Sequence, residues 1–581
     1  MNSRKIILLF LLILAVSPPA MDFLRTPDSR FVALSGYDFP PNYVFVDDYE
    51  GDSLRMHYIV AGPDDSPAVL MIHGNPTWCY QFREVIPHIV DAGYRAIAID
   101  LIGMGRSDKP ADFDDYTYDR HAGWVSQIFA HLDSSLDLDR VTIFGHDYGT
   151  PFGIRLMAEH YPLRFDAFID ANASLPDGDF ISPVHLNWRE FVRDNPDVPV
   201  GHVISNNVNP PLTPEEIYAY YAPFPDSTYK MAVRSFPEMV PDSSSDTEAV
   251  VNIAAWEFME TFERPFMTIF SDYDPSAFPS GRIEFIDRVP GAFGEPHPQL
   301  DVAHYAPEDR PEEVAEEVIR FLDDVYHPEP FIRLHYSRFD SGFAGFESGG
   351  ADCTYDTARH AVRIQSGSGT ASSVLQSDSM DLSSYGTLKV AFRYIPEGMD
   401  SAENFVVELW NGAAWIEILN LVAQVDFSDD ANDYGFVRIN CDSVIFASDA
   451  RIRIRCDATD DSDAIYLFNL GIYARIDTMA AAVSANEMPP SPDKIEVSAH
   501  PNPFNSAVSI TAPAGAEIEV FDVNGRIVAT PSFVLPLNKG EMSEGQRGFI
   551  WRPDASLGSG VYLVRATVGE ETVSKRVVYL K

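Results

Sequence analysis

An aspartate stands at the centre of a glycine-flanked segment, GHDYG at residues 145–149. An apolar run precedes the segment and a helical pattern follows it, which is the strand–turn–helix context of a nucleophile elbow. Where a serine hydrolase carries Ser, this sequence carries Asp147. A carboxylate that attacks a saturated carbon displaces a leaving group and forms an ester, so Asp147 favours carbon–halogen or epoxide cleavage. A single aspartate in such a loop is also a common polar turn residue. The presence or absence of catalytic partners elsewhere in the chain decides between these two interpretations of Asp147.

Two further side chains fit the partners that a nucleophilic carboxylate needs. His304 follows the last predicted core strand, and nucleophile, acid and histidine then occur in the chain order expected for this kind of site. His304 is the candidate base that activates water against the ester. Asp274 is the preferred acid that orients His304, because it follows a strand after a short loop and precedes a proline; Asp272 is the alternative.

Hydrogen-bond donors for developing negative charge are the third requirement. The backbone N–H groups of Asn75 and Tyr148 are placed for an oxyanion hole, one in a His-Gly loop and the other directly after the nucleophile. A leaving halide needs further donors, which the side chain of Asn75 and the indole of Trp188 could supply. Trp188 is equally well interpreted as an ordinary core aromatic.

The elements that must position these residues alternate between strands and helices. Apolar runs at residues 68–72, 95–99, 140–145, 165–170 and 265–270 are separated by helical patterns, which predicts a mostly parallel sheet covered on both faces. We assign residues 21–330 to this catalytic domain. A stretch rich in proline and asparagine interrupts the pattern and predicts a helical cap at about residues 176–255.

Residues 40–326 resemble the haloalkane dehalogenases, a family in the branch of the α/β-hydrolase superfamily that uses an aspartate nucleophile. The resemblance implies an α/β-hydrolase core with a helical cap, a small halogenated organic substrate, water as the second reactant, and no metal or organic cofactor. It implies Asp147 as nucleophile, His304 as base and Asp274 as acid, with Trp188 as a halide ligand from the cap. The matching segments are HGNPTW at 73–78, GMGRSDKP at 103–110, the elbow, YAPFPD at 221–226 and YKMAVRSFPEMV at 229–240.

One position departs from the family pattern. Tyr148 stands where these enzymes usually carry the tryptophan that donates its indole N–H to the halide. Two functions follow, namely a dehalogenase with an altered halide site, which the cap segments favour, or an epoxide hydrolase that protonates the epoxide oxygen through cap tyrosines. A surface adhesion protein with an inactive hydrolase fold is a third hypothesis, and the intact set of Asp147, Asp274 and His304 argues against it. The tyrosines available in the cap are Tyr218, Tyr220, Tyr221 and Tyr229.

Composition points to an exported protein. The chain of 581 residues has a formal net charge of −45, which opposes binding to nucleic acid or to anionic lipid because both need basic residues. Residues 1–20 combine basic residues, a short apolar run and a small terminal residue, as a secretory signal peptide does. The sequence has no other segment of membrane length.

Two β domains are predicted after the catalytic domain. Residues 331–477 show strand alternation and resemble the jelly-roll modules of secreted bacterial proteins. Acidic loops at 426–430 and 457–463 could ligate calcium, but solvated loops are the favoured interpretation in so acidic a chain. Cys441 and Cys456 could form a disulfide or remain thiols. A linker at 478–494 leads to residues 495–581, which resemble the C-terminal sorting domain of the type IX secretion machinery and imply a secreted or outer-membrane-surface location.

Overall fold

The computed structural model contains two compact units, residues 1–483 and residues 484–581. The predicted signal peptide and linker lie outside the residues that the structure describes. The described chain runs from residue 21 to residue 579, without residues 275–278, 328, 366–373, 402, 429–432, 458–462, 477–497, 501–507, 514–516, 522–525, 530–545, 552, 554–556, 558–559 and 569–570.

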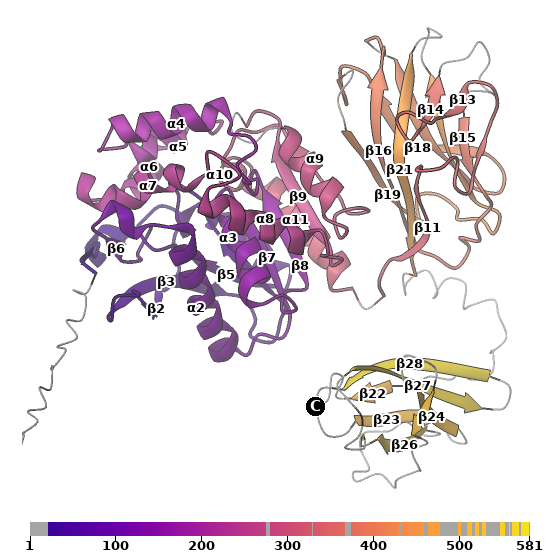
Figure 1. Cartoon of the computed structure of the whole chain (residues 1–581), viewed down its shortest axis with the longest axis horizontal. Coiled ribbons are helices and arrows are strands. Elements are labelled where there is room, and N and C mark those ends of the chain that lie inside the picture. The colour runs from indigo at the N-terminus through magenta and orange to yellow at the C-terminus, as the bar shows by residue number, and fades with distance from the viewer. Residues whose placement is uncertain are drawn as a thin grey trace, which may run out of the picture. The chain divides into compact units, whose positions relative to one another are not determined.

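A mostly parallel sheet of eight strands forms the centre of the first half of the chain (Figure 1). Its strand order is β10-β9-β8-β7-β4-β5-β3-β2, in which β3 pairs with both β2 and β5 in antiparallel fashion and the other pairs are parallel. The inner strands are runs of fully buried residues, as expected when helices cover both faces. The strands are β2 (Asn42–Asp47), β3 (Ser53–Ala61), β4 (Ala68–Ile72), β5 (Arg95–Ile99), β7 (Val141–His146), β8 (Ala167–Ala171), β9 (Phe266–Ser271) and β10 (Gln299–Leu300).

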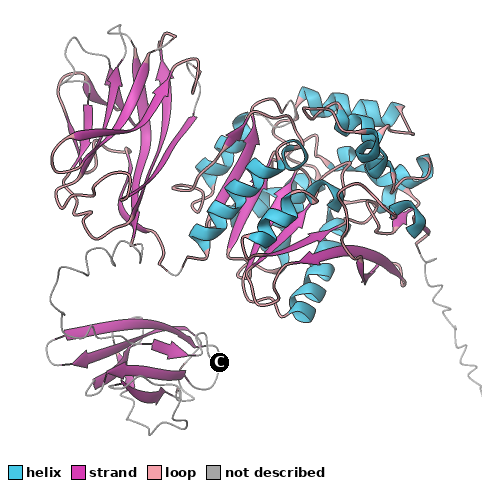
Figure 2. Cartoon of the chain, turned by 180° about the vertical axis from the view of Figure 1, so that it is seen from behind, coloured by secondary structure: helices cyan, strands magenta, loops and turns pink. Residues whose placement is uncertain are grey.

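Helices pack around these strands (Figure 2). On the core, α1 contacts α11, and α3 contacts α2 and α8. The helix α2 begins after Thr117, whose hydroxyl accepts the N–H of Arg120, and ends at Asp137 in the left-handed conformation. The core helices are α1 (Val85–Asp91), α2 (Tyr118–Leu136), α3 (Gly149–Arg155), α8 (Thr247–Met259), α9 (Pro279–Arg288), α10 (Ala306–Asp309) and α11 (Pro311–Val325).

Four helices between β8 and α8 gather on one side of the sheet, as the cap prediction expects (Figure 1). The start of α6 carries a capping box between Thr213 and Glu216, with Pro214 in its first turn. Because α8 packs on α3 of the core, the predicted cap at residues 176–255 includes part of a core helix. The cap helices are α4 (Pro183–Asp194), α5 (Val200–Ser205), α6 (Pro214–Tyr221) and α7 (Met231–Met239).

Antiparallel strands follow the α/β region, which confirms the predicted change of fold class. They form a six-stranded and a five-stranded sheet that share one apolar core. All four cysteines of the chain are described and each is a thiol, so no disulfide joins Cys441 to Cys456. Both acidic loops lie partly outside the described residues. The strands are β11 (Ile332–Arg338), β12 (Phe346–Ser348), β13 (Cys353–Asp356), β14 (Ala361–Gln365), β15 (Val374–Ser377), β16 (Thr387–Glu397), β17 (Asn404–Trp410), β18 (Trp415–Val422), β19 (Asp433–Asn440), β20 (Arg451–Asp457) and β21 (Ala464–Arg475).

The second unit is also built of antiparallel strands. It contains a three-stranded and a four-stranded sheet, with the orders β22-β23-β26 and β25-β24-β27-β28. Throughout the described part of the chain, no helix combines the length and apolar character needed to cross a membrane. The strands are β22 (Ser498–His500), β23 (Val508–Pro513), β24 (Glu517–Phe521), β25 (Ile527–Ala529), β26 (Gln546–Trp551), β27 (Gly560–Val568) and β28 (Glu571–Tyr579).

Candidate active site

The turn between β7 and α3 holds Asp147 in a strained conformation. Its φ angle is 51°, in the left-handed region that non-glycine residues seldom adopt. Glycines on both sides make the turn possible. A Cβ atom on Gly149 would lie 1.9 Å from the carbonyl oxygen of Ile72, and one on Gly145 would lie 2.6 Å from the Cα of Thr150. The GHDYG pattern is therefore required by close packing of this turn against the neighbouring strand and helix.

The carboxylate of Asp147 rests against the loop that follows β4. The backbone N–H of Asn75 donates to Asp147 Oδ2 over 2.8 Å. A Cβ atom on Gly74 would lie 2.4 Å from both the Cβ and Oδ2 atoms of Asp147, so only glycine leaves room for the carboxylate. The predicted oxyanion donor from the His-Gly loop thus already contacts the carboxylate in this structure.

His304 lies between the two carboxylates that the sequence analysis paired with it. Its Nδ1 atom is 2.7 Å from Asp274 Oδ2, and its Nε2 atom is 4.0 Å from Asp147 Oδ2. The carboxylate of Asp274 is fully buried, whereas the alternative acid, Asp272, is exposed and its backbone N–H donates to Leu300. The structure therefore brings together Asp147, His304 and Asp274, and leaves Asp272 outside the group.

Two carboxylates determine the charge of His304. Burial disfavours the imidazolium, but Asp274 and Asp147 more than offset this effect, so the pKa of His304 is raised to about 10. At neutral pH the resting site therefore contains a positive ring between two negative groups. Neutralising either carboxylate would lower the pKa of His304.

Two residues that the sequence analysis missed hold the backbone of His304. His146 Nε2 lies 2.9 Å from the carbonyl oxygen of His304, and the side-chain amide of Asn172 donates to the same oxygen over 2.8 Å. Burial lowers the pKa of His146 to about 4, so this ring is neutral and donates through Nε2. His146 ends β7 and Asn172 directly follows β8, so both lie at the edge of the sheet that carries Asp147. This position at the strand ends is the signal in the sequence that could have identified them as site residues.

A cavity of about 540 Å³ opens above Asp147 between core and cap. Its buried lining residues include Tyr118, Tyr148 and Pro151. Its more exposed lining residues include acidic side chains and one arginine, Arg288, which is paired with Glu284 over 2.7 Å. The lining residues are Tyr118, Asp147, Tyr148, Pro151, residues 172–177, residues 179–182, His185, Val240, Glu284 and Arg288.

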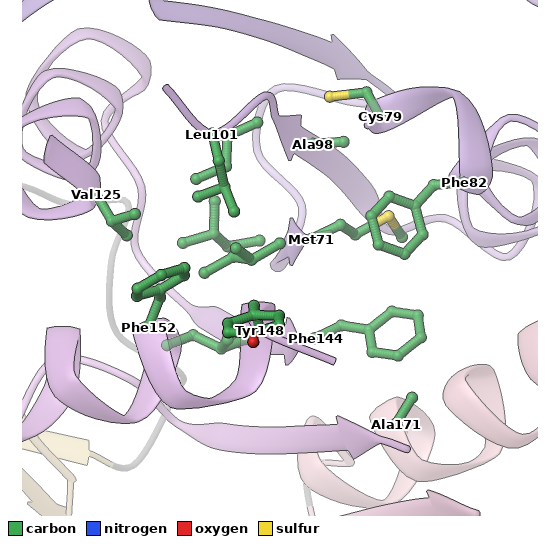
Figure 3. Close-up of a cluster of buried hydrophobic side chains, with 14 of the residues drawn as sticks. Met71, Cys79, Phe82, Ala98, Leu101, Val125, Phe144, Tyr148, Phe152 and Ala171 are labelled. Atoms are coloured by element: carbon green, nitrogen blue, oxygen red, sulfur yellow. The ribbon is translucent and has the colours of Figure 1, made fainter. Parts of the chain in front are cut away.

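The predicted halide donors do not all face this cavity. The hydroxyl of Tyr148 donates to the carbonyl oxygen of Phe236 in α7 over 2.9 Å, and the ring belongs to the buried cluster around Phe144 and Phe152 (Figure 3). The side chain of Asn75 donates to Val233 O over 3.1 Å, and Asn75 is not among the lining residues.

Trp188 is not among the residues that line this cavity, and its halide-binding role stays a prediction. Trp188 follows the lining residue His185 by three positions of α4. Its half-buried side chain packs against the core cluster, and its ring stacks on Phe191 with centroids 5.7 Å apart. This is the ordinary aromatic packing that the sequence analysis kept as its alternative.

The cap tyrosines of the epoxide-hydrolase hypothesis are also absent from the cavity lining. The hydroxyl of Tyr220 donates to Glu308 over 2.5 Å, and the side chain of Tyr218 is 51% exposed. Tyr221 and Tyr229 lie elsewhere in the cap. The epoxide-hydrolase alternative therefore finds no cap tyrosine among the residues that line this cavity, and it stays a prediction.

One buried group has side chains of the metal-binding types. Ligand atoms of His57, Cys79 and Asp100 lie within 4.8 Å of one another. The Asp100 carboxylate already accepts from the His57 ring over 2.7 Å and from the backbone N–H groups of Cys79 and Arg106, each over 2.8 Å. These bonds hold the loop after β5 in place, and they use the oxygens that a metal would need.

The fold and the site define an α/β-hydrolase with an aspartate in the nucleophile elbow. Residues 67–291 match the family model of the α/β-hydrolase fold. A haloalkane dehalogenase of Psychrobacter cryohalolentis is 42% identical over 306 residues, which cover 52% of this chain and 99% of that protein. One from Mycolicibacterium paratuberculosis is 40% identical over 300 residues, covering 52% and 98%. A solved haloalkane dehalogenase structure from Paraglaciecola agarilytica has 29% identity and a TM-score of 0.48, covering 51% and 97%.

The chain belongs to the haloalkane dehalogenases and is a hydrolase that acts on carbon–halide bonds. Residues 498–580 match a second family model, that of the secretion system C-terminal sorting domain. This domain identifies the protein as a type IX secretion substrate that is released or displayed at the cell surface.

Proposed function

We propose that the protein cleaves haloalkanes through a covalent ester on Asp147. In the first step a carboxylate oxygen attacks the halogen-bearing carbon, the carbon–halogen bond breaks, and halide leaves with the bonding electron pair. The observation that carries this proposal is the position of Asp147, held by the N–H of Asn75 at 2.8 Å and with His304 Nε2 at 4.0 Å. A carboxylate anchored in this way is oriented toward the cavity without further rearrangement.

The second step uses the charge change that the first one produces. Ester formation removes the negative charge of Asp147, which is one of the two groups that raise the pKa of His304. The imidazolium then releases its proton and becomes a base, with Asp274 holding Nδ1. His304 takes a proton from water, and the hydroxide attacks the ester carbonyl carbon. The bond between this carbon and the alkyl oxygen then breaks. The alkyl oxygen takes the proton of the added hydroxyl and leaves as the alcohol, and the Asp147 carboxylate is restored. The Asn75 N–H stabilises the oxyanion formed during this attack.

The substrate class that fits the cavity is an uncharged haloalkane. Apart from Arg288, the charged residues that line the cavity are acidic, and Arg288 is engaged by Glu284 and Glu260. An anionic haloacid would therefore meet repulsion without a free cationic partner.

We also propose that residues 1–20 direct the chain through the inner membrane before the sorting domain acts.

The proposed function is tested by halide release from a series of bromo- and chloroalkanes. The full chain after removal of residues 1–20 is expected to release one halide per alcohol formed, and Asp147→Ala to release none. Mass spectrometry of a peptide containing residue 147 after rapid acid quenching is expected to show the added alkyl group. Diol formation from epoxides without halide release from any haloalkane would support the epoxide-hydrolase alternative instead.

A further inference from the structure

The helix α9 (Pro279–Arg288) carries apolar residues on two opposite faces. Phe285 is fully buried in the core of the α/β region, where its ring centroid lies 5.1 Å from that of Trp256. Ile283 and Ile286 lie on the other face of the helix and are 9% and 3% exposed. A helix that is apolar on two faces needs a partner on each of them. The second partner of α9 comes from a later part of the chain.

The outer face of the six-stranded antiparallel sheet covers this second face of α9. Ile283 and Ile286 form one apolar cluster with Ala391 of β16 and Tyr434 of β19. The five-stranded sheet packs on the inner face of the six-stranded one through their shared apolar core. We call the two sheets together the β-sandwich (residues 332–475). Its six-stranded sheet therefore buries apolar side chains on both faces, against its own core and against α9.

Buried ion pairs complete this contact. Asp324 of α11 is 6% exposed, and three cations of the β-sandwich surround its carboxylate. Lys389 and Arg438 each place a nitrogen 3.0 Å from its oxygens, and Arg475 places one at 2.7 Å. Lys389 is itself only 2% exposed and also pairs with Glu295 over 3.0 Å. A charge left in such a contact without its partner is strongly destabilising, so these pairs fix how the α/β region and the β-sandwich meet.

The β-sandwich also holds the backbone of the loop at residues 291–298. The hydroxyl of Tyr434 accepts the N–H of Gly294 over 2.9 Å and donates to Glu295 O over 3.2 Å. Gly294 has a φ angle of 96°, and a Cβ atom there would lie 2.7 Å from the ring of Tyr473 in β21. Glycine at this position is therefore required both by the backbone conformation and by the tyrosine ring of the β-sandwich.

A second connection runs from the β-sandwich to a central strand of the α/β region. Arg282 of α9 donates to the carboxylate of Asp433 in β19 and to the carbonyl oxygen of His297 over 3.3 Å. Burial lowers the pKa of His297 to about 3, so its ring is neutral. Its Nε2 donates to Ala292 O over 2.9 Å, and its Nδ1 accepts the N–H of Thr268 in β9 over 3.1 Å. These bonds connect β19 to β9 through the loop.

The two segments that this loop touches carry the candidate acid and base. Leu300 O in β10 accepts the N–H of Asp272, directly after β9, over 2.9 Å. Asp274 follows two residues after Asp272, and His304 follows four residues after Leu300. A displacement of residues 291–298 would therefore shift the acid, the base or both. A misplacement of about 1 Å at a catalytic group can cost roughly 100-fold in rate.

We propose that the β-sandwich is a positioning domain of the active site, in which Tyr434 and Asp433 hold the segments that carry Asp274 and His304. This inference rests on the proposed roles of Asp274 and His304. None of the described residues of the β-sandwich lines the active-site cavity, so it acts only through the backbone of residues 291–298. A module joined to the enzyme only by a linker would need neither the buried ion pairs nor the glycine that accommodates its tyrosine.

The test alters the contact from the side of the β-sandwich, in the full chain after removal of residues 1–20. Tyr434→Phe keeps the ring and removes both hydrogen bonds to the loop. Ala391→Glu adds a long charged side chain where the sheet packs on α9. Glu408→Gln is the matched control, because it breaks an ion pair of 2.6 Å with Arg453 inside the five-stranded sheet. The measurements are kcat and KM for one bromoalkane, hydrogen exchange of residues 291–304 by mass spectrometry, and the melting temperature.

A positioning role predicts a change in kcat rather than in KM. Tyr434→Phe is expected to lower kcat roughly 2- to 30-fold, the range for residues that modulate a site without touching it, with KM unchanged and faster exchange of residues 291–304. Ala391→Glu is expected to lower kcat further, because it displaces the whole contact. Glu408→Gln is expected to lower the melting temperature while kcat and KM stay within about 2-fold of the wild type.

Equal kcat values in Tyr434→Phe and Glu408→Gln, or unchanged exchange of residues 291–304 in Tyr434→Phe, would overturn the positioning role and leave the proposed reaction intact. Absence of halide release by the unsubstituted protein would instead overturn the roles of Asp274 and His304 on which the inference rests. If Ala391→Glu does not fold, Tyr434→Phe decides the question alone, because it removes only a hydroxyl group.

Discussion

The two sides of the candidate site differ in how closely their residues lie to the positions expected from the sequence. On the hydrolytic side, Asp147, His304 and Asp274 lie together as the chain order indicated. On the leaving-group side, Tyr148 donates its hydroxyl to the cap backbone and Trp188 stacks on a neighbour outside the cavity. Residues at the ends of parallel strands meet at one edge of the sheet whatever the details of packing. Residues that act from helices depend on the rotation of each helix, which small changes in the cap can alter.

The largest expected effect concerns the base. His304→Gln should allow one halide per enzyme to be released and then stop, because the ester on Asp147 cannot be hydrolysed. Steady-state turnover is expected to fall about 1,000- to 10,000-fold, as for removal of one member of a catalytic triad. Stopped-flow detection of halide together with mass spectrometry of the enzyme checks this. Loss of the initial burst as well would place His304 in the alkylation step instead.

A matched pair of substitutions tests which carboxylate orients His304. Asp274→Asn keeps the shape but removes the charge next to His304 Nδ1, and we expect kcat to fall roughly 100- to 10,000-fold. Asp272→Asn, two residues away and exposed, should stay within about 2-fold of the wild type. Steady-state kinetics on one bromoalkane compares them. Equal losses in the two variants would contradict the pairing seen in the structure.

The charge coupling predicts a pH effect with a definite sign. The pKa of His304 in the folded protein, about 10, lies above its ordinary value of 6.5, so proton binding stabilises the fold below pH 6.5. This contribution is lost as the pH rises from 6.5 toward about 10. Asp147→Asn imitates the uncharged ester and should lower the pKa of His304 and reduce this loss.

Titration of the His304 ring by NMR, with unfolding curves on both sides of this pH range, measures the coupling. Asp137→Asn is a suitable control, because it removes a carboxylate from the C-terminal end of α2 rather than from the site. An unchanged His304 titration in Asp147→Asn would contradict the release of a proton on ester formation.

The smallest effects are expected on the leaving-group side. Tyr148→Phe loses the hydrogen bond to Phe236 O and should lower the free energy of unfolding by about 1 kcal/mol, with kcat/KM within about 3-fold of the wild type. Trp188→Phe should change kcat/KM by less than about 2-fold. Urea unfolding and the halide assay check both. A large loss of bromide binding in either variant would show that the substituted residue binds the halide, as the sequence predicts. The two sides of the site would then agree equally well with the sequence.

Much of the fold could be predicted because its signals are local. Buried apolar runs marked the parallel strands, as in β4 and β7. Strand alternation in residues 331–477 marked the antiparallel sheets, as in β16 and β20. The residue at which the cap ends could not be predicted from the sequence, because α8 shows the same helical pattern whether it belongs to the cap or packs on the core.

The sequence by itself predicted the chemistry that we propose for Asp147 and determined the order of its partners along the chain. The glycines beside Asp147 leave no room for side chains and so fix the turn that holds this aspartate. Asp274 and His304 follow strands that end at the same edge of the sheet, which brings them close to Asp147. Tertiary structure alone decided where the side chains of the predicted halide donors lie. The direction of the Tyr148 hydroxyl and the stacking of Trp188 on Phe191 depend on how the cap packs. Such contacts join residues far apart in the chain and leave no periodic signal in the sequence.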